Sequence, residues 1–469
     1  MTRLATVVVV NYNGAHLLGP CLRALAGQDL GPDSYQVWVV DNASSDGSLE
    51  LLARDHPGVR VLANPDNRGF AGGNNTALRQ VSTPYAVLVN NDAVPEPDWL
   101  RLLLAPFDGP DGDRIAVTSG KVVFLPRFVR LRLRTAGFTP GAHDARELGV
   151  RVHAVQVDGE DVAPHVLWER LTYGREGEAG GAYWWTRPEG ELLLPVPPVG
   201  DVEVSWHWAA ESAKPVTLSW DGGHAVLAAP ADTPGTSTFT VSASAQRLDV
   251  VNNAGGEVLT NGYGADRGYQ AVDDGRFDAP VDLFSGCGNG MAVRSEVGHA
   301  VGWFDDDFFL YYEDTDLSWR IRALGWRIRY APDAVLRHHH SASSGEWSPL
   351  FVFHTDRNRL LMLTKDASAG FAWREVPRYA VTTASLAARA VRTAAATRTR
   401  PALRQHLSRL RVIASYLRLL PVMLGRRRAM GRTAAVSRRE LESMLVTHTA
   451  WQAEAAGPAA PQGIPELAA

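Results

Sequence analysis

The stretch LATVVVVNYNG, residues 4–14, sets the expectation for the first half of the chain. Its run of β-branched residues predicts a strand that is buried on both faces, as in a parallel sheet. A polar loop and a segment with helical spacing follow it directly. The same scheme returns three times, in YQVWVVDNASSDGS, VRVLANPDNRGFAGGNNTAL and YAVLVNNDAVPEPDWL. Repeated strand–loop–helix units of this length predict an α/β sheet with right-handed crossovers.

Polar residues stand at or just beyond the ends of the predicted strands, namely Asn11, Asp41, Asn67 and Asp92. Ligands of open α/β sheets bind outside the carboxyl ends of the strands, so we expect these side chains to line one crevice. A purely structural role is the alternative for the two acids. Asp41 would then cap a helix that starts near Asp46, and Asp92 would be a turn residue before Pro95.

The pattern changes after about residue 125. Short alternating segments broken by Gly, Pro and Asp, such as DVEVSWHWAA, replace the helical periodicity. They predict an antiparallel β-sandwich over residues 126–249, inserted into an α/β domain that occupies 1–125 and 250–365. A basic helical segment over 366–450 and a disordered tail over 451–469 complete the expected organisation. Within the basic segment, Pro421 predicts a break in the helix.

The predicted insert is rich in tryptophan, and two roles for these rings are open. Exposed tryptophans serve as platforms for sugars, whereas buried ones fill the core of a sandwich. The residues concerned are Trp168, Trp184, Trp185, Trp206, Trp208 and Trp220.

The composition is that of a globular protein with 469 residues, 45% of them hydrophobic and 21% charged. This length predicts two or three domains. Two cysteines cannot form a disulfide framework, which favours a reducing, cytoplasmic location. We expect no signal peptide and no transmembrane helix, because the first apolar run is short and no stretch of about 18 apolar residues occurs.

The net charge of −4 hides a strong asymmetry along the chain. Residues 374–439 hold sixteen of the 47 basic residues and only one of the 51 acidic ones, which leaves −19 on the remainder. Such a segment indicates an anionic partner. We expect no nucleic acid, since no base-reading module accompanies the arginines. Peripheral contact with the inner face of the cell membrane, or a solvated basic face of a helical cap, are the two interpretations that remain.

The stretch FLYYEDTDLSWRIRALGWRIRYAPDAVLRHHH, residues 309–340, combines acids, aromatic rings and histidines. Leu317 and Ile321 have the spacing of a short helix that Gly325 would end. Asp316 falls in the first turn, where it complements the helix dipole. Asp314 falls at the start of the helix, where an ionised carboxylate within reach of a hydroxyl group is a general base, and the neighbouring Glu313 is the rival for that role.

The order of these motifs resembles the inverting family 2 glycosyltransferases with a GT-A fold, in particular the rhamnosyltransferase-like members, with an inserted β-rich domain. The resemblance covers roughly residues 6–124 and 252–365. Its carriers are VVVVNYNG, VVDNASSDGS, NRGFAGGNN, VLVNNDA, GWFDDDFFLYYEDTDLSWRIRALGWR and VLRHHHSASSG. It implies that residues 1–125 form the nucleotide-sugar-binding half and that 250–365 form the acceptor and catalytic half.

The resemblance also implies roles for single residues. Asp314 would be the catalytic base, with Glu313 as its rival, and Asp92 with His338 would hold a divalent cation, Mg²⁺ or Mn²⁺. The family's usual Asp-x-Asp motif is here Asn90-Asn91-Asp92, so an amide replaces one carboxylate. The residues expected to bind the nucleotide sugar are Asn11, Asn13, Asp41, Asn67, Gly69, Asn74, Asn91 and Gly286.

By this resemblance the protein is a metal-dependent inverting glycosyltransferase. It would move a sugar, for which rhamnose is a candidate, from a nucleotide-diphosphate donor to a cell-surface glycan or a polyprenyl-linked acceptor. The alternative is a carbohydrate-binding scaffold with a degenerate active site, because one carboxylate of the metal motif is missing. A sugar nucleotidyltransferase is disfavoured, since the first loop lacks a Gly-rich, Arg-containing sequence.

Overall fold

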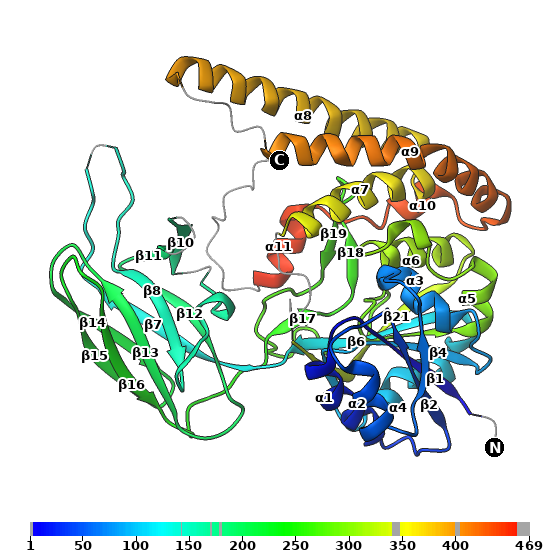
Figure 1. Cartoon of the computed structure of the whole chain (residues 1–469), viewed down its shortest axis with the longest axis horizontal. Coiled ribbons are helices and arrows are strands. Elements are labelled where there is room, and N and C mark those ends of the chain that lie inside the picture. Colours follow the sequence, from blue (N-terminus) through cyan, green and yellow to red (C-terminus); the bar gives the residue numbers. More distant parts are fainter. Residues whose placement is uncertain are drawn as a thin grey trace. The chain divides into compact units, whose positions relative to one another are not determined.

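A computed structural model describes residues 3–141, 143–168, 171–177, 181–339, 348–398 and 404–456. The chain divides into two compact units. The first unit combines Met1–Leu125 with Val251–Ala469, and the second is the intervening stretch Pro126–Val250. The α/β sheet, the inserted antiparallel sheets and the C-terminal helices that the sequence predicts are all confirmed (Figure 1).

The first unit is built on a nine-stranded mixed sheet. Its first four strands are mutually parallel, β20 is antiparallel to both of its neighbours, and β21 is parallel to β6. Off the main path, β17 (Val251–Asn253) pairs with β6. In spatial order the other strands are β3 (Arg60–Ala63), β2 (Tyr35–Asp41), β1 (Ala5–Asn11), β4 (Tyr85–Asn90), β20 (Met291–Arg294), β6 (Ile115–Phe124), β21 (Arg327–His338) and β5 (Ala93–Pro95).

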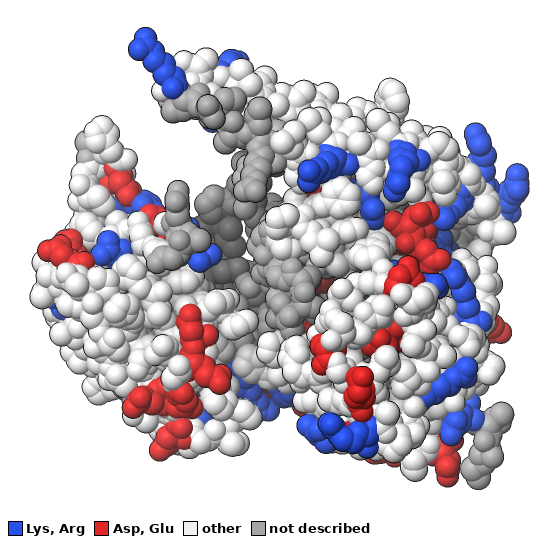
Figure 2. Space-filling view, viewed as in Figure 1, with Lys and Arg blue, Asp and Glu red and all other residues white. Residues whose placement is uncertain are grey.

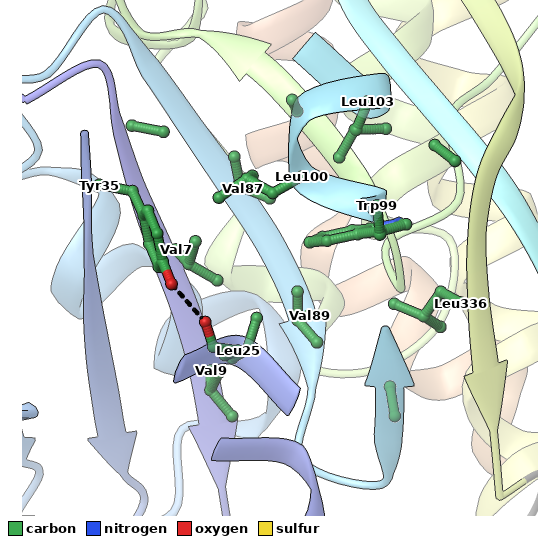
Figure 3. Close-up of a cluster of buried hydrophobic side chains, with 14 of the residues drawn as sticks. Val7, Val9, Leu25, Tyr35, Val87, Val89, Trp99, Leu100, Leu103 and Leu336 are labelled. Atoms are coloured by element: carbon green, nitrogen blue, oxygen red, sulfur yellow. Dashed lines mark hydrogen bonds between the residues drawn. The ribbon is translucent and has the colours of Figure 1, made fainter. Parts of the chain in front are cut away.

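Helices cover both faces of this sheet, which is why its strands are continuously apolar. Alternate residues of β1 divide between the faces: Val7 and Val9 join one core cluster, and Val8 joins the other. The first cluster packs under α1 (Ala15–Ala26), α2 (Ser48–Asp55) and α4 (Trp99–Leu104), as Figure 3 shows for part of it. The second packs under α3 (Gly69–Leu78), α5 (Ser295–Val301) and α6 (Glu313–Ala323).

Five further helices follow the sheet. The third core cluster of this unit joins α7, α8, α9 and α10 to α6. α9 runs through Pro421 without a break, so the predicted interruption is wrong; packing of α9 against α7 outweighs the lost hydrogen bond. No described helix is both long and apolar enough to cross a bilayer. The bounds are α7 (Pro349–Asp366), α8 (Ala369–Thr397), α9 (Arg404–Thr433), α10 (Arg438–Glu442) and α11 (His448–Ala456).

The first residues of the disordered tail that was expected from residue 451 onward belong to the helix α11. Trp451 donates a hydrogen bond of 2.8 Å to the Asp266 carbonyl, and Glu454 pairs with Arg267 at 2.7 Å. These contacts order a helix on β18 (Gly256–Val258) and β19 (Gly264–Asp266), where composition alone predicted disorder. The rest of the predicted tail, 457–469, lies outside the described residues.

The second unit consists of two antiparallel sheets around one core. Trp168, Trp206 and Trp208 lie in this core, which answers the sequence question for three of the six tryptophans. One sheet contains β10 (Thr172–Glu176), β11 (Tyr183–Thr186), β8 (Arg151–Val157), β13 (Val202–Ala209) and β16 (Gly235–Val241), with β9 (Glu160–Asp161) beside β8. The other contains β12 (Glu189–Val196), β7 (Arg127–Thr135), β14 (Lys214–Trp220) and β15 (Gly223–Ala229).

A network of buried ion pairs connects α6 with α7 and with the loop that precedes α6. The ammonium group of Lys365 pairs with Asp305 at 2.6 Å and also with Asp316, all three side chains being nearly inaccessible. Asp316 pairs in addition with Arg320 at 2.7 Å. Burial alone would raise the pKa of Asp316, but the charges of Arg320 and Lys365 outweigh it and hold that pKa at about 2. From α9, Arg426 reaches Asp305 at 2.6 Å.

We expect Lys365→Met to destabilise the first unit by about 3–5 kcal/mol, because it leaves two buried carboxylates without their shared cation. Urea unfolding followed by tryptophan fluorescence measures the change. Arg54→Met is the control, since Arg54 pairs with Asp55 at the surface and its loss should leave the unfolding midpoint unchanged. Equal midpoints for the two variants would show that the network contributes nothing.

Candidate active site

The carboxyl ends of β1, β2 and β4 meet in a network of amide and carboxylate groups. Asn11 and Asp41 are register partners at the ends of β1 and β2. The Asn11 Nδ2 group donates to Asp41 Oδ1 at 3.2 Å and to Ser44 Oγ at 3.1 Å, and its Oδ1 accepts from Asn91 Nδ2 at 2.8 Å. The backbone N–H of Ser44 donates to Asp41 Oδ2 at 2.9 Å. We call Asn11, Asp41, Ser44 and Asn91 the amide hub.

The helix-capping alternative for Asp41 does not hold. α2 starts at Ser48, and its N-cap Gly47 makes no side-chain bond. Asp46, not Asp41, accepts from the Ser48 hydroxyl and backbone N–H. Asp41 is buried instead beneath the loop after β2, and its oxygens keep accepting capacity, since a carboxylate offers about four lone-pair positions.

The loop after β1 closes over the amide hub. Asn13 has φ of 50° and accepts from the Ser45 backbone N–H at 2.8 Å. A Cβ atom at Gly14 would lie 2.2 Å from Asn91 Nδ2, so only glycine fits between this loop and the hub. The ring of Tyr12, which sequence reasoning overlooked, is 49% exposed beside the hub. A large ring left in solvent at a strand end is a stacking surface.

Asn67 and Gly69 lie at the start of α3, next to the hub, and Asn74 lies in the middle of that helix. Asn67 Oδ1 accepts from the Gly69 N–H at 2.8 Å, and the Gly69 carbonyl accepts from Asn42. Gly69 has φ of 68°, and a Cβ there would lie 2.3 Å from the Phe309 carbonyl oxygen. Asn74 is buried and donates to the Phe70 carbonyl within α3. Gly69 is therefore required for the close approach of α3 to the segment around Phe309.

Asp92 and His338 face each other across the end of β21. The distance from His338 Nε2 to Asp92 Oδ1 is 3.2 Å. His338 Nδ1 lies 3.0 Å from Asn252 Oδ1, so this ring nitrogen is engaged with the amide while Nε2 faces Asp92. The sequence did not single out Asn252, whose amide orients the imidazole as ligand histidines are oriented in metal sites.

This pair has the properties of two ligands for a divalent cation. Asp92 Oδ1 is buried and has no hydrogen-bond donor in acceptable geometry. Two ligand atoms bound side by side to a six-coordinate ion at about 2.1 Å lie about 3 Å apart, which fits the observed separation. Among the described residues no three His, Cys, Asp or Glu side chains gather as a metal cluster. Asp92 and His338 thus suit an ion that takes its other ligands from phosphate and water.

Asp314 and Glu313 begin α6, as the sequence predicts. Asp314 Oδ2 accepts from the Gly288 N–H at 2.9 Å, and its Oδ1 accepts from the Thr315 N–H at 2.6 Å. Burial raises the pKa of Asp314 above its ordinary value, although these hydrogen bonds oppose the rise. Glu313 is more deeply buried, and burial together with the charge of Asp314 raises its pKa well above normal. Asp314 is the better placed of the two to act as a base.

A short hydrogen-bonded segment connects Asp314 with the end of β4. Asn289 follows Gly288, and its Oδ1 accepts from the Asn90 backbone N–H at 3.1 Å. Gly286 lies earlier in this segment, where a Cβ would lie 3.0 Å from the sulfur of Met291. The segment before β20 thus connects the start of α6 with the strand end that precedes Asp92. Asn289 is a third residue that sequence reasoning overlooked, after Tyr12 and Asn252.

The aromatic residues before α6 form a strained turn. Phe309, Tyr311 and Tyr312 all have φ between 63° and 70°, which costs about 1–3 kcal/mol for each such residue. The buried amide of Asn358 on α7 compensates by donating to the carbonyl groups of Phe308, Leu310 and Tyr311. The rings themselves are largely core: Trp303, Phe304, Phe308 and Tyr312 are buried, and Phe309 and Tyr311 are partly exposed.

The predicted site residues therefore form three groups along one edge of the sheet. The first group lies at the carboxyl ends of β1 and β2 and around α3. It consists of Asn11, Asn13, Asp41, Asn91, Asn67, Gly69 and Asn74. The second group is the pair Asp92 and His338. The third is Asp314 with Glu313 beside Gly288. His339 is exposed and donates its backbone N–H to the Asp92 carbonyl, and His340 lies outside the described residues.

Two family models match the chain. Residues 6–147 match the model described as glycosyl transferase family 2, and residues 242–352 match glycosyl transferase family group 2. The two stretches include every predicted site residue. The part between them consists of residues of the inserted unit.

Proteins similar to this chain include glycosyltransferase AglE of Haloferax volcanii, 27% identical over 25% of this chain and 39% of its own length. An N-acetylglucosaminyl-diphospho-decaprenol L-rhamnosyltransferase of Mycobacterium tuberculosis is 38% identical over 14% of this chain and 22% of its own length. The chain thus spans well under half of these relatives.

Among solved structures, a mannosyltransferase from Pyrobaculum calidifontis in complex with GDP-Man and Mn²⁺ aligns with 94% of this chain and 88% of its own, at 16% identity and a TM-score of 0.40. The family assignment rests on the two family models and on the similarity to these relatives. On these matches, the chain belongs to family 2 of the glycosyltransferases.

Proposed function

We propose that the protein transfers a sugar from a nucleotide-diphosphate donor to a hydroxyl group, with inversion at the anomeric carbon. The observation that carries this proposal is that Asp314 starts α6 on the same connected edge of the sheet as the Asp92–His338 pair. Such a transfer needs a donor pocket, charge neutralisation at the leaving diphosphate and a base for the acceptor hydroxyl. Each group of site residues supplies one of these.

The donor pocket is formed by the amide hub and the start of α3. The proposed donor-binding residues are those of the sequence prediction: Asn11, Asn13, Asp41, Asn67, Gly69, Asn74, Asn91 and Gly286. The exposed ring of Tyr12 joins them as the surface on which the nucleobase stacks. The remaining lone pairs of Asp41 accept from the base or ribose, and the hub holds that carboxylate in a fixed orientation.

Asp92 and His338 hold the divalent cation in this proposal, Mg²⁺ or Mn²⁺. When bound, the cation offsets the negative charge of the leaving diphosphate. Asp92 contributes a buried carboxylate oxygen, and His338 contributes Nε2, which the contact of Nδ1 with Asn252 orients. Asn91, at the middle position of the motif Asn90-Asn91-Asp92, donates to Asn11, which a carboxylate could not do.

Asp314 acts as the general base that takes the proton of the acceptor hydroxyl. The Gly288 N–H holds one oxygen of its carboxylate in place, and the raised pKa makes it a stronger base than an exposed carboxylate. Burial and the charge of Asp314 raise the pKa of Glu313 and so favour its protonated form beside the base.

The proposed acceptor is a cell-surface glycan or a polyprenyl-linked sugar, and rhamnose is the candidate donor sugar. The support is the relative from Mycobacterium tuberculosis, whose name gives a decaprenol-linked acceptor and an L-rhamnosyl group. A degenerate carbohydrate-binding scaffold is the competing proposal, supported by the amide in place of one carboxylate of the metal motif.

A basic face of α9 is proposed to contact the membrane that carries such an acceptor. Leu410 and Leu417 are each more than half exposed on one face of α9, and the exposed Arg411 and Arg418 each follow one of them on the adjoining flank of the helix. An exposed stripe of leucine and arginine is typical of helices that lie in an anionic lipid surface. Figure 2 shows Lys and Arg side chains gathered over these C-terminal helices.

We expect Asp314→Asn to lower kcat about 10²- to 10⁴-fold, because it removes the base and retains the shape of the side chain. Nucleotide release from a panel of sugar donors, with and without acceptor, measures the rate. Glu313→Gln is the matched variant and should retain most of the activity. Unchanged turnover in Asp314→Asn would exclude Asp314 as the base, and no turnover by the wild type with any donor would favour the scaffold.

The rate should also fall as the pH drops through the raised pKa of Asp314. Below that pKa the carboxylate is protonated and cannot accept the hydroxyl proton, so activity is present above it and is lost below it. The acid limb of a pH–kcat profile should therefore lie above the ordinary pKa of an aspartate, which is about 3.9. An acid limb at or below that value would contradict a buried base.

We expect His338→Ala to weaken Mn²⁺ binding at least about tenfold, since it removes one of the two protein ligands and second-shell changes alone cost about 10- to 100-fold. Titration of Mn²⁺ by electron paramagnetic resonance, without donor, measures the affinity directly. Asn252→Ala should weaken it less, through loss of orientation only. His339→Ala is the control, because that side chain is exposed and should leave Mn²⁺ affinity unchanged.

The full chain should sediment with vesicles that contain phosphatidylserine at low salt and be released by high salt. Replacing Leu410 and Leu417 by serine should lower binding about tenfold or more, since two apolar side chains no longer leave water. Val226→Ser is the control, because Val226 is an equally exposed apolar residue of the inserted unit. If the replacement of both leucines leaves vesicle binding unchanged, α9 is not the part of the chain that contacts the membrane.

A further inference from the structure

One sheet of the inserted unit carries a cluster of rings that the proposed transfer does not use. A register shift at His153 interrupts the alternation of β8: Val152 and Val155 lie in the sandwich core, while Arg151 and His153 lie outside it. β11 alternates: Trp184 stacks on the core residue Trp168, and Trp185 faces outward. The outer cluster, which we call the ring platform, consists of Phe138, Arg151, His153, Tyr183, Trp185 and His207.

Members of the ring platform contact one another across four segments of the chain. The ring of Trp185 lies edge-on to Phe138 at 5.6 Å and to Tyr183 at 6.4 Å between centroids. His153 lies 5.7 Å from Tyr183 and 6.0 Å from His207. All six side chains are partly exposed, in contrast to the fully enclosed Trp206 and Trp208 of the core. The cluster is therefore a preformed surface of rings and not part of the sandwich core.

Arg151 brings a cation to this surface without an acidic partner. Its guanidinium lies over the rings of Tyr183 at 5.4 Å and Trp185 at 5.9 Å. One terminal N–H group donates to the Asp232 carbonyl at 3.0 Å, but Nε–H is buried and has no acceptor. Among the described residues no carboxylate forms an ion pair with Arg151. A buried donor that stays unsatisfied costs stability, so a ligand that supplies an acceptor is favoured here.

His153 provides a second unsatisfied polar atom. Its Nε2 is buried without a hydrogen-bond partner. Burial and the charge of Arg151 lower the pKa of His153, so the ring is neutral and one nitrogen donates while the other accepts. The neighbouring strands add hydroxyl groups to the same face: Ser205 on β13 and Thr236 and Thr238 on β16, with His207 Nδ1 3.3 Å from Thr236 Oγ1.

We propose that the ring platform binds a saccharide chain that carries carboxylate or phosphate groups. Sugar rings present C–H faces that pack on aromatic rings and hydroxyl groups that both donate and accept. The platform offers both kinds of partner. Strands with hydroxyl side chains flank it, whereas the centre of a protein–protein interface is typically apolar. Arg151 supplies the charge complement, because a guanidinium pairs with carboxylate or phosphate through two parallel N–H bonds.

This site would be separate from the proposed active site in sequence and in unit, since every ring-platform residue belongs to residues 126–250. A second binding site on the same chain raises the effective concentration of a polymer at the enzyme by linking two binding events. The binding itself does not depend on catalysis. It is therefore expected in Asp314→Asn as in the wild type, which separates this proposal from the proposed transfer.

Affinity electrophoresis of the full chain, without any nucleotide sugar, tests the proposal. The probes are polygalacturonate for carboxylate, poly(glycerol phosphate) teichoic acid for phosphate, and dextran as a neutral polymer. We expect retardation by at least one acidic polymer and none by dextran. Trp185→Ala and Arg151→Gln should each raise the apparent Kd about tenfold, which corresponds to loss of one ring or charge contact.

Two further variants keep the test decisive. Trp185→Phe retains a ring and should retain most of the affinity, so that loss of folding in Trp185→Ala would not be mistaken for loss of a contact. Trp373→Ala removes an 80% exposed tryptophan of α8 and should change nothing. Retardation that survives both Trp185→Ala and Arg151→Gln would overturn the proposal. Equal retardation by dextran, or full competition by millimolar inorganic phosphate, would also overturn it.

Discussion

The pairing of the Lys365 ammonium group with both Asp305 and Asp316 is the interaction on which the position of α6 depends. It sits where α6, α7 and the loop before α6 meet, and all three side chains are nearly inaccessible. A buried ion pair is a poor source of net stability but is costly to break, so it acts as a strict geometric constraint. Because Asp316 is two residues after Asp314, this constraint also fixes where the proposed base stands. The helix that carries Lys365, α7, also carries Asn358, which maintains the strained turn at Phe309–Tyr312.

Asparagine amides do most of the bridging at the candidate site. An amide donates and accepts at once, so it can connect groups that a carboxylate would repel. Asn11 accepts from Asn91 while it donates to Asp41, Asn252 orients His338, and Asn289 holds the end of β4. The departure from the acidic motif of the family lies at Asn90, whereas Asn91 fills the middle position of the motif. Asn91 is occupied with the amide hub, and the charge of the proposed metal site is left to Asp92.

The two units bury their apolar side chains with different patterns of apolar residues along their strands. In the first, helices cover both faces of the sheet, so its strands are apolar throughout. In the second, each sheet has one buried and one open face, so its strands alternate. Alternation is what separates Trp184 from Trp185, neighbours in sequence that face opposite sides. A single tryptophan-rich stretch therefore supplies both core and surface rings.

Much of the architecture was determined by the sequence alone. Continuous β-branched runs predicted the parallel strands, alternation predicted the antiparallel insert, and leucine spacing with Gly325 predicted α6, because these patterns reflect local burial that each segment must satisfy. The break at Pro421 and the start of the tail were predicted wrongly, since the packing of α9 against α7 and the contacts of Trp451 and Glu454 are not local. Only the tertiary structure decided which polar residues meet. Asn252 lies 86 positions from His338, and Asn358 lies 47 from Tyr311. Those pairings arise when strands and helices cross in space, and no spacing along the chain encodes them.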